Sequence, residues 1–203
     1  MTDAPMKGPE TTAPPFADPP FADTVWRWWS GLQEDPRTKR PADRATLAEL
    51  RRARGLSDVV MIPAFQELWR RVGRPTAERA ERLALAAAVV AHVRVHSGVP
   101  FARQLGPRDV RDATTATLSP LRLRRVLAID DGEAEVLRTA LIRLVKHAGG
   151  VANVRDLADS ALYWTEKTRI AWAFAYWNGP QPGATSAEDA KAEQEPEPTG
   201  ETG

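Results

Sequence analysis

The sequence predicts an all-α protein, a single helical bundle of seven or eight helices. Apolar residues recur at three- and four-residue spacing between residues 24 and 179, and no stretch alternates apolar and polar residues with β-branched enrichment. Capping residues and glycines bracket these periodic segments, where helices begin and end. The chain is 42% hydrophobic, which is enough to fill a substantial core.

The first two predicted helices carry a tryptophan cluster and a dense run of arginines. One helix begins near residue 23 and bears the Trp28-Trp29 doublet. The other begins after Asp43, a good N-cap, and runs to Arg54 ahead of Gly55. Because the tryptophans of the chain recur within apolar helical stripes, we interpret them as core residues rather than as base-stacking platforms.

The next two predicted helices include the most apolar part of the chain. A helix over residues 63–72 opens with proline, which suits a first helical turn. Thr76 can cap a long helix that runs to Ser97 and ends at Gly98. Its centre, residues 83–95, is apolar on nearly all sides and is expected to form the heart of the core.

The second half of the domain is predicted as a loop followed by four more helices. Residues 98–118 are expected to be a loop with one short helical turn around Phe101–Leu105. Ser119-Pro120 and Asn153 each open one of these helices, and three of the four end at turns: Asp130-Asp131-Gly132, Gly149-Gly150 and Asn178-Gly179-Pro180. These helices are predicted over residues 120–129, 133–148, 153–164 and 166–177.

Both ends of the chain are predicted to be disordered, outside a helical domain spanning residues 24–179. Residues 1–23 contain six prolines and a tandem Pro-Pro-Phe-Ala-Asp repeat, which we interpret as a spacer rather than a docking motif. Residues 180–203 form an acidic tail rich in proline, glutamate, alanine and glycine.

The net charge of +1 conceals a strong segregation of charge along the chain. Residues 1–23 hold one lysine and four acids, and residues 184–203 hold one lysine and six acids. The intervening residues hold 26 bases and 17 acids, a net charge of +9. A basic body of this kind favours a phosphate-rich partner, although arginine used for solubility alone gives the same composition.

The sequence offers no constellation for catalysis. Cysteine is absent, which excludes disulfides and thiolate chemistry. His92 and His96 lie four apart on one predicted helix face, as two metal ligands can, but no third ligand is evident nearby. Gly149-Gly150 lacks the lysine and hydroxyl of a phosphate-binding loop. We therefore expect no enzyme activity, cofactor, metal or small-molecule substrate, and a cytoplasmic protein with no membrane segment.

Cations of several predicted helices lie away from the apolar stripes. At 100° per residue, Arg44, Arg51 and Arg52 lie opposite Leu47 and Leu50 on one helix. Arginine forks on such faces can clamp phosphates, provided that cations from at least three helices form one continuous path. The candidate nucleic-acid-binding residues are Arg44, Arg51, Arg52, Arg122, Arg125, Arg143, Lys146, Lys167 and Arg169.

Several short motifs follow one another in a defined order over residues 26–177. They are Trp28-Trp29-x-x-Leu32-Gln33, Asp43-Arg44-Ala45-x-Leu47, Ile62-Pro63-Ala64-Phe65, Arg103-Gln104-Leu105-Gly106, Leu157-Ala158-x-x-x-Leu162-Tyr163-Trp164 and Lys167-Thr168-Arg169-x-x-Trp172. In their joint order and spacing they resemble the CasB family, the small subunit of the type I-E CRISPR Cascade complex.

The resemblance implies a non-catalytic helical subunit in antiviral defence. Such subunits occur as two copies packed head to tail along CasC subunits, between the CasA and CasE subunits. Their basic surface helps to hold guide RNA and target DNA in an R-loop, the displaced strand included. Basic or polar family positions match Arg51, Arg52, Arg122, Arg125, Arg143 and Lys146, and recurrent arginines match Arg44 and Arg169. Ala128 departs from the pattern where relatives can carry a cation.

Three other classes of function stay open on the sequence alone. A helical transcription regulator would present a helix-turn-helix dimer to a palindromic duplex. A protein-interaction module would use the same basic faces to bind acidic proteins. A metal-dependent nuclease would require carboxylates that converge only in the folded chain.

Overall fold

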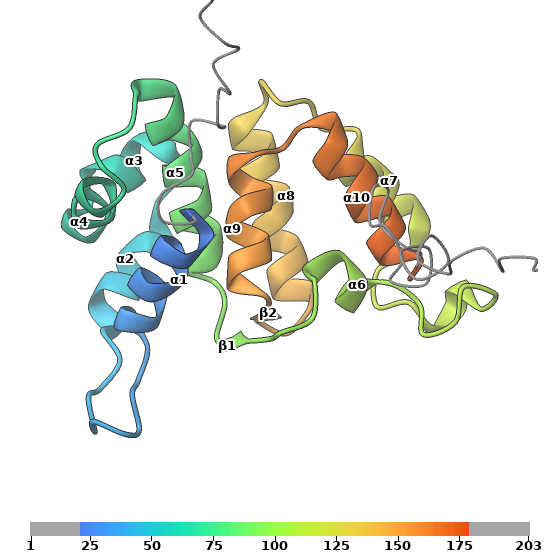
Figure 1. Ribbon diagram of the computed structural model, residues 1–203, viewed down its shortest axis with the longest axis horizontal. Coiled ribbons are helices and arrows are strands. Elements are labelled where there is room, and N and C mark those ends of the chain that lie inside the picture. Colours follow the sequence, from blue (N-terminus) through green and yellow to red (C-terminus); the bar gives the residue numbers. More distant parts are fainter. Residues whose placement is uncertain (1–20, 179–203) are drawn as a thin grey trace, which may run out of the picture.

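Ten α-helices make up most of residues 21–178, the part of the chain that this computed structural model describes. The all-α class is therefore confirmed, with two more helices than the larger number predicted (Figure 1). The elements are α1 (Phe21–Leu32), α2 (Arg44–Arg52), α3 (Leu56–Met61), α4 (Pro63–Arg71), α5 (Ala77–Val90), β1 (Val95–His96), α6 (Phe101–Leu105), the 3-10 turn η1 (Ala113–Thr115), α7 (Pro120–Leu127), α8 (Ala134–His147), β2 (Val151–Ala152), α9 (Val154–Leu162) and α10 (Glu166–Tyr176).

The helices form three groups along the long axis of the molecule. Helices α5, α8 and α9 occupy the middle, where α5 packs against both of the others (Figure 1). Helices α1 to α4 cover one side, with α1 on α9 and with α3 and α4 on α5. Helices α6, α7 and α10 form the opposite side, where α6 packs on α10. No helix in the described part of the chain is long and apolar enough to cross a membrane.

Helix α5 is the centre of the core, as its apolar character predicts. Every residue from Leu83 to Ala91 is buried. Five of these residues are alanines, and their small side chains let α9 approach closely. Burial on all sides explains why residues 83–91 include no polar side chain.

The predicted end of this central helix at Ser97 is wrong, because α5 stops at Val90. The chain then turns, and β1 pairs in parallel with β2, with Val95 opposite Val151. Backbone amides of β1 and its flanks donate to Gly150 and Ala152 carbonyls at 2.7–3.2 Å, replacing the helical bonds that would otherwise have continued. The strand partner lies more than fifty residues away, so local sequence could not reveal the break.

Helix α3 was not predicted, and it begins where the sequence indicated a terminator. Gly55 is the residue before α3, and α2 already ends at Arg52. Within α3, Leu56 and Val59 are buried, and the Leu56 amide donates to Glu135 Oε1 at 2.5 Å. A six-residue helix stabilised by a carboxylate of α8 leaves little periodic signal.

The tryptophans pack as core residues, as predicted. Trp28, Trp29, Trp164 and Trp172 are buried. The indole of Trp28 donates to the Ala64 carbonyl at 3.0 Å, which anchors α1 on α4. The predicted caps also form: Asp43 accepts from the Thr46 amide at 3.0 Å, and Asn153 accepts from the Asp156 amide at 3.2 Å.

Helix α1 begins three residues earlier than the predicted domain. Phe21 and Ala22 are buried, and Asp23 pairs with Arg155 at 2.5 Å, so residues 21–23 belong to the helix rather than to the extension. The remainder of the two predicted extensions, including the first copy of the proline-phenylalanine repeat, lies outside the described residues.

Candidate nucleic-acid interface

A groove of about 790 Å³ lies between α7 and α8. Its floor is apolar and includes Val126, Ile129, Ala140 and Leu144. Its basic lining residues are Arg122, Arg125, Arg143 and His147. The groove thus combines three permanent positive charges with an apolar floor.

The helical repeat explains why α7 and α8 direct arginines into this groove. On α7, Leu123 and Val126 are buried, and Arg122 and Arg125 flank that stripe. Arg124 is exposed on the same helix but does not line the groove. On α8 the buried stripe includes Leu141 and Leu144, next to Arg143.

The arginines of the groove have no carboxylate partner among residues 21–178. Glu135 is the one carboxylate in the described lining, and it already accepts from Arg138 Nε at 2.6 Å and from the Leu56 amide at 2.5 Å. The described ion pairs include none with Arg122, Arg125 or Arg143. These three guanidinium groups are therefore available to an external anion.

A second group of cations surrounds His92, on the other side of α8. Arg51 Nε donates to the Ala91 carbonyl at 2.6 Å, just beyond the end of α5. Burial, followed by the charges of Lys146, Arg51 and Arg138, lowers the pKa of His92 to about 4. Partial burial lowers the pKa of Arg51, and the charge of Arg94 adds to that shift. These mutual effects show that cations of α2, α8 and the α5–β1 turn lie close together.

Helix α8 joins the two groups into one surface. Lys146 lies three residues after Arg143, so the two side chains are neighbours on α8. Arg143 lines the groove, and Lys146 lies within electrostatic range of His92 beside Arg51. Arg44 lies seven residues before Arg51, on the same face of α2. We call this surface the basic path and define it by Arg44, Arg51, Lys146, Arg143, Arg122 and Arg125.

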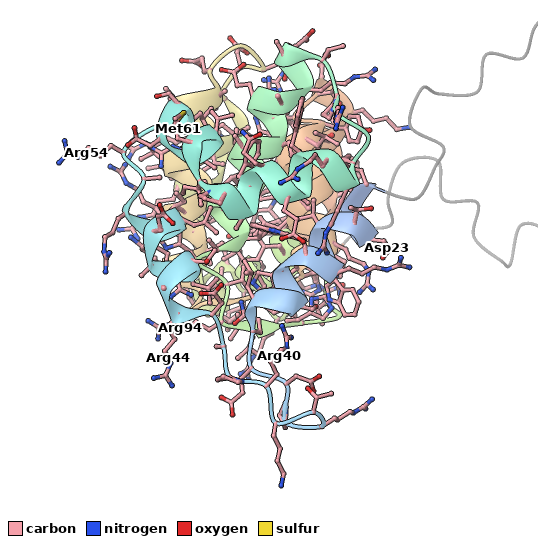
Figure 2. All side chains as sticks on the ribbon, turned by 90° about the vertical axis from the view of Figure 1, so that its left-hand side faces the viewer. Asp23, Arg40, Arg44, Arg54, Met61 and Arg94 are labelled. Carbon is pink, nitrogen blue, oxygen red and sulfur yellow. The ribbon has the colours of Figure 1, made fainter. Side chains whose placement is uncertain are left out.

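Arg94 also belongs near this surface, although it was not among the candidates. It is exposed and lies beside Arg51. Figure 2 shows Arg44, Arg54 and Arg94 projecting at one edge of the molecule, away from Asp23. The sequence placed Arg94 inside a buried helix, so only the break after Val90 reveals its exposure.

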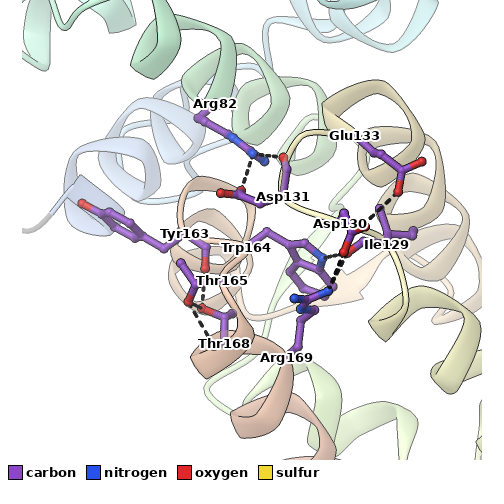
Figure 3. A network of polar contacts seen from close by, with 10 residues as sticks. All are labelled: Arg82, Ile129, Asp130, Asp131, Glu133, Tyr163, Trp164, Thr165, Thr168 and Arg169. Carbon is purple, nitrogen blue, oxygen red and sulfur yellow. Dashed lines mark hydrogen bonds and ion pairs between the residues drawn. The ribbon is translucent and has the colours of Figure 1, made fainter.

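Three predicted candidates lie outside the basic path. Arg169 Nη1 donates to the Ile129 carbonyl and to Asp130, both at 3.3 Å, and the Trp164 indole donates to that same carbonyl at 2.9 Å (Figure 3). Lys167 lines a separate pocket that also contains Asp159. Arg52 is exposed at the end of α2, and no described contact links it to the path.

Other arginines stabilise the fold. Arg40 donates to carbonyls at the end of α1, including Ser30 at 3.2 Å. Arg82 pairs with Asp131 in the network of Figure 3. The guanidinium of Arg155 pairs with Asp23 and lies 4.0 Å from the centre of the Trp26 ring. These three arginines thus have intramolecular partners, whereas the groove arginines have no carboxylate partner among the described residues.

The predicted placement of His92 and His96 on one helix face is wrong, because α5 ends before both. His96 lies in β1, where its Nδ1 accepts from the Val154 amide at 3.2 Å and its ring packs near Trp26 and Trp29. No group of three or more histidines and carboxylates among the described residues could hold a metal ion. Neither histidine therefore belongs to a metal site among the described residues.

Comparisons with known proteins agree with this architecture. The family model described as CRISPR-associated protein Cse2 matches residues 46–177. The fold resembles a chain in the crystal structure of E. coli Cascade bound to a PAM-containing double-stranded DNA target, with a TM-score of 0.53 and 19% identity, over 76% of this chain and 92% of that one. A search of curated proteins finds no match. The predicted resemblance is confirmed, and the chain belongs to the CRISPR-associated Cse2 family, also called CasB.

Proposed function

We propose that this chain is a non-catalytic, nucleic-acid-binding small subunit of an RNA-guided CRISPR surveillance complex of the type I-E Cascade kind. In this role its basic path binds phosphates of the opened target DNA, the displaced strand included, and stabilises the R-loop. Its partners are guide RNA and target DNA, a second copy of itself, and subunits of the CasA, CasC and CasE types. Guide–target pairing supplies sequence specificity.

One observation carries this proposal: six cations on three helices form a path, and the described residues offer the groove arginines no carboxylate partner. Exposed cations that are not neutralised internally attract a polyanion. The membership in the Cse2 family and the likeness to a chain of DNA-bound Cascade support the same function. Lys167, Arg169 and Arg52 stay predicted contacts outside this path.

The arrangement suits binding without sequence preference. Arginine forks match the oxygens of a phosphate, which every nucleotide carries, and the apolar floor of the groove lacks the donor and acceptor pattern that reads base edges. Affinity should therefore depend strongly on salt, because each phosphate contact releases counterions from the strand.

The decisive experiment replaces two adjacent cations of α8. Arg143→Ala with Lys146→Ala is expected to weaken binding of random-sequence single-stranded DNA and to lower the slope of log affinity against log salt by about 0.7 per lost contact. In the assembled complex the same variant should weaken R-loop locking. Fluorescence anisotropy across a salt series measures the slope, and a thermal melt verifies that the variant is folded.

A matched control removes two arginines that lie off the path. Arg27 on α1 and Arg124 on α7 are both exposed, and neither lines the groove. Arg27→Ala with Arg124→Ala makes the same change in net charge and should leave the slope near the wild-type value. Equal slopes for both double variants would remove the basic path as the binding surface. A preference for a palindromic duplex would instead favour the transcription-regulator alternative.

A further inference from the structure

The acidic C-terminal segment, residues 184–203, has a charge opposite to that of the basic path. It carries six acids and one lysine, a net charge of −5, and contains no aromatic residue. We infer that this segment docks on the basic path of its own chain and competes there with nucleic acid. The inference rests on the proposed function, because nucleic acid is the ligand that the segment displaces.

The described chain ends beside the groove. Helix α10 ends at Tyr176, whose phenol donates to the Leu118 carbonyl at 2.5 Å. Leu118 lines the groove at the start of α7. Figure 1 shows the last turn of α10 next to α6 and α7. The acidic segment therefore leaves the fold at one end of the surface that it would cover.

The segment is long enough to reach every cation of the groove. Its first acid, Glu188, lies ten residues after Asn178, and ten residues span at most about 36 Å. Helix α8 has 14 residues and is about 21 Å long, which sets the length of the groove. The last acid, Glu201, lies thirteen residues further along the chain, so several acids can be near the groove at once.

Charge complementarity identifies the occupant. Arg122, Arg125 and Arg143 lack carboxylate partners among the described residues, and glutamate carboxylates fit the same guanidinium forks as phosphates. A covalent tether gives the segment a local concentration on the order of millimolar. Because each exposed ion pair is weak, a long nucleic acid displaces the segment, whereas a short one competes poorly.

The docked state is tested directly, without nucleic acid, by zero-length carbodiimide cross-linking of the full chain at low salt. The five lysines of the chain are Lys7, Lys39, Lys146, Lys167 and Lys191. We expect amide links from Lys146 to glutamates 188–201 within one chain, and their loss in high salt. Equal linking of these glutamates to Lys39, or links found only between two chains, would overturn the inference.

A second experiment measures competition. Substitution of all six acids of the segment by their amides, E188Q, D189N, E193Q, E195Q, E197Q and E201Q, should tighten binding of a short single-stranded oligonucleotide about three- to tenfold at low salt. The gain should vanish when Arg143→Ala and Lys146→Ala are added. The control neutralises Asp3, Glu10 and Asp18 at the other end of the chain and should give no such gain.

The two experiments separate the inference from the proposed function. If the wild-type chain binds the oligonucleotide and the amide variant binds no more tightly, the competition is refuted and the proposed function stands. If neither chain binds any oligonucleotide while the Lys146 cross-links form, the proposed function fails and the docked segment stands.

Discussion

His92 is the residue whose ionisation reports most directly on the cations around it. Burial, as the largest cause, and the positive charges of Lys146, Arg51 and Arg138 together lower its pKa to about 4. A protonated His92 would add a further charge to a site that already holds three. The imidazole is therefore neutral at physiological pH, and Lys146, Arg51 and Arg138 supply the positive charge around it.

This shift predicts a pH-dependent stability with a definite sign. The unfolded chain protonates His92 near its ordinary pKa of 6.5, whereas the folded chain does so only near 4. The unfolded state therefore binds more protons between these values, and the free energy of unfolding falls as the pH falls from 6.5 to 4. Between pH 7.5 and 4.5 the free energy of unfolding should therefore fall by about 1–3 kcal/mol less in His92→Gln than in wild type. Urea unfolding at the two pH values measures this difference.

The pH dependence of His92→Gln must be compared with that of wild type, because Asp159 changes the free energy of unfolding with pH in the opposite direction. Burial, followed by the charges of Asp156 and Asp23, raises the pKa of Asp159 to about 6. Its contribution to stability is present below pH 3.8 and is lost as the pH rises through 6. The difference between the two proteins cancels this effect, and equal pH dependence in both would contradict the prediction for His92.

At the scale of elements, the junction of α6 with α10 depends on one glycine. Gly106 has an ordinary backbone conformation, with φ of −77°, so its conformational freedom is not the reason for it. A Cβ atom at this position would lie 1.9 Å from the Tyr176 carbonyl oxygen. Glycine is needed here because the backbones of the two elements touch.

Gly106→Ala is therefore expected to lower the free energy of unfolding by about 1–3 kcal/mol, because the backbones of α6 and α10 must separate. Chemical denaturation measures the change. Gly98→Ala is the control, since no atom lies within 4 Å of a Cβ built there. Its stability should stay within about 0.5 kcal/mol of wild type, and a similar loss in both variants would contradict the steric explanation.

Element boundaries were predictable where the signal is local. The caps Asp43 and Asn153 bind amides three residues away, and both helix starts were predicted correctly. The end of α5 and the existence of α3 depend on partners far along the chain, the β2 backbone and Glu135. Single-sequence periodicity contains no information about such partners, so these two elements could be found only in the folded structure.

At the scale of the whole molecule, placing residues at 100° intervals around each helix identified the cations that point outward. It could not identify the side chains of other helices that lie next to them. Six of the nine predicted residues share the basic path, because their helices happen to be adjacent around α8. Arg169 is held by Asp130, thirty-nine residues earlier, and Lys167 faces another pocket. Neither placement follows from the local sequence of α10.

If the basic path acts as one surface, its helices should contribute separately and additively. Single variants Arg44→Ala on α2, Arg125→Ala on α7 and Arg143→Ala on α8 should each lower the salt slope for single-stranded DNA by about 0.7. The triple variant should show the sum, because the three side chains lie on different helices and each is expected to contact its own phosphate. Anisotropy titrations across salt concentrations measure these slopes. If one substitution lowered the salt slope as much as the triple variant and the other two left it unchanged, the binding surface would be a single local site instead.

The strand pair β1–β2 has a consequence for how the protein is made. Its partners Val95 and Val151 are 56 positions apart, and closing a loop of this length costs about 3–4 kcal/mol of chain entropy. Helices α6, α7 and α8 all lie inside that loop, and the packing of α5 on α9 must offset its cost. During translation this pair can form only after Ala152 has been synthesised, so α5 and the three helices inside the loop are tied together by the strands only from that point on.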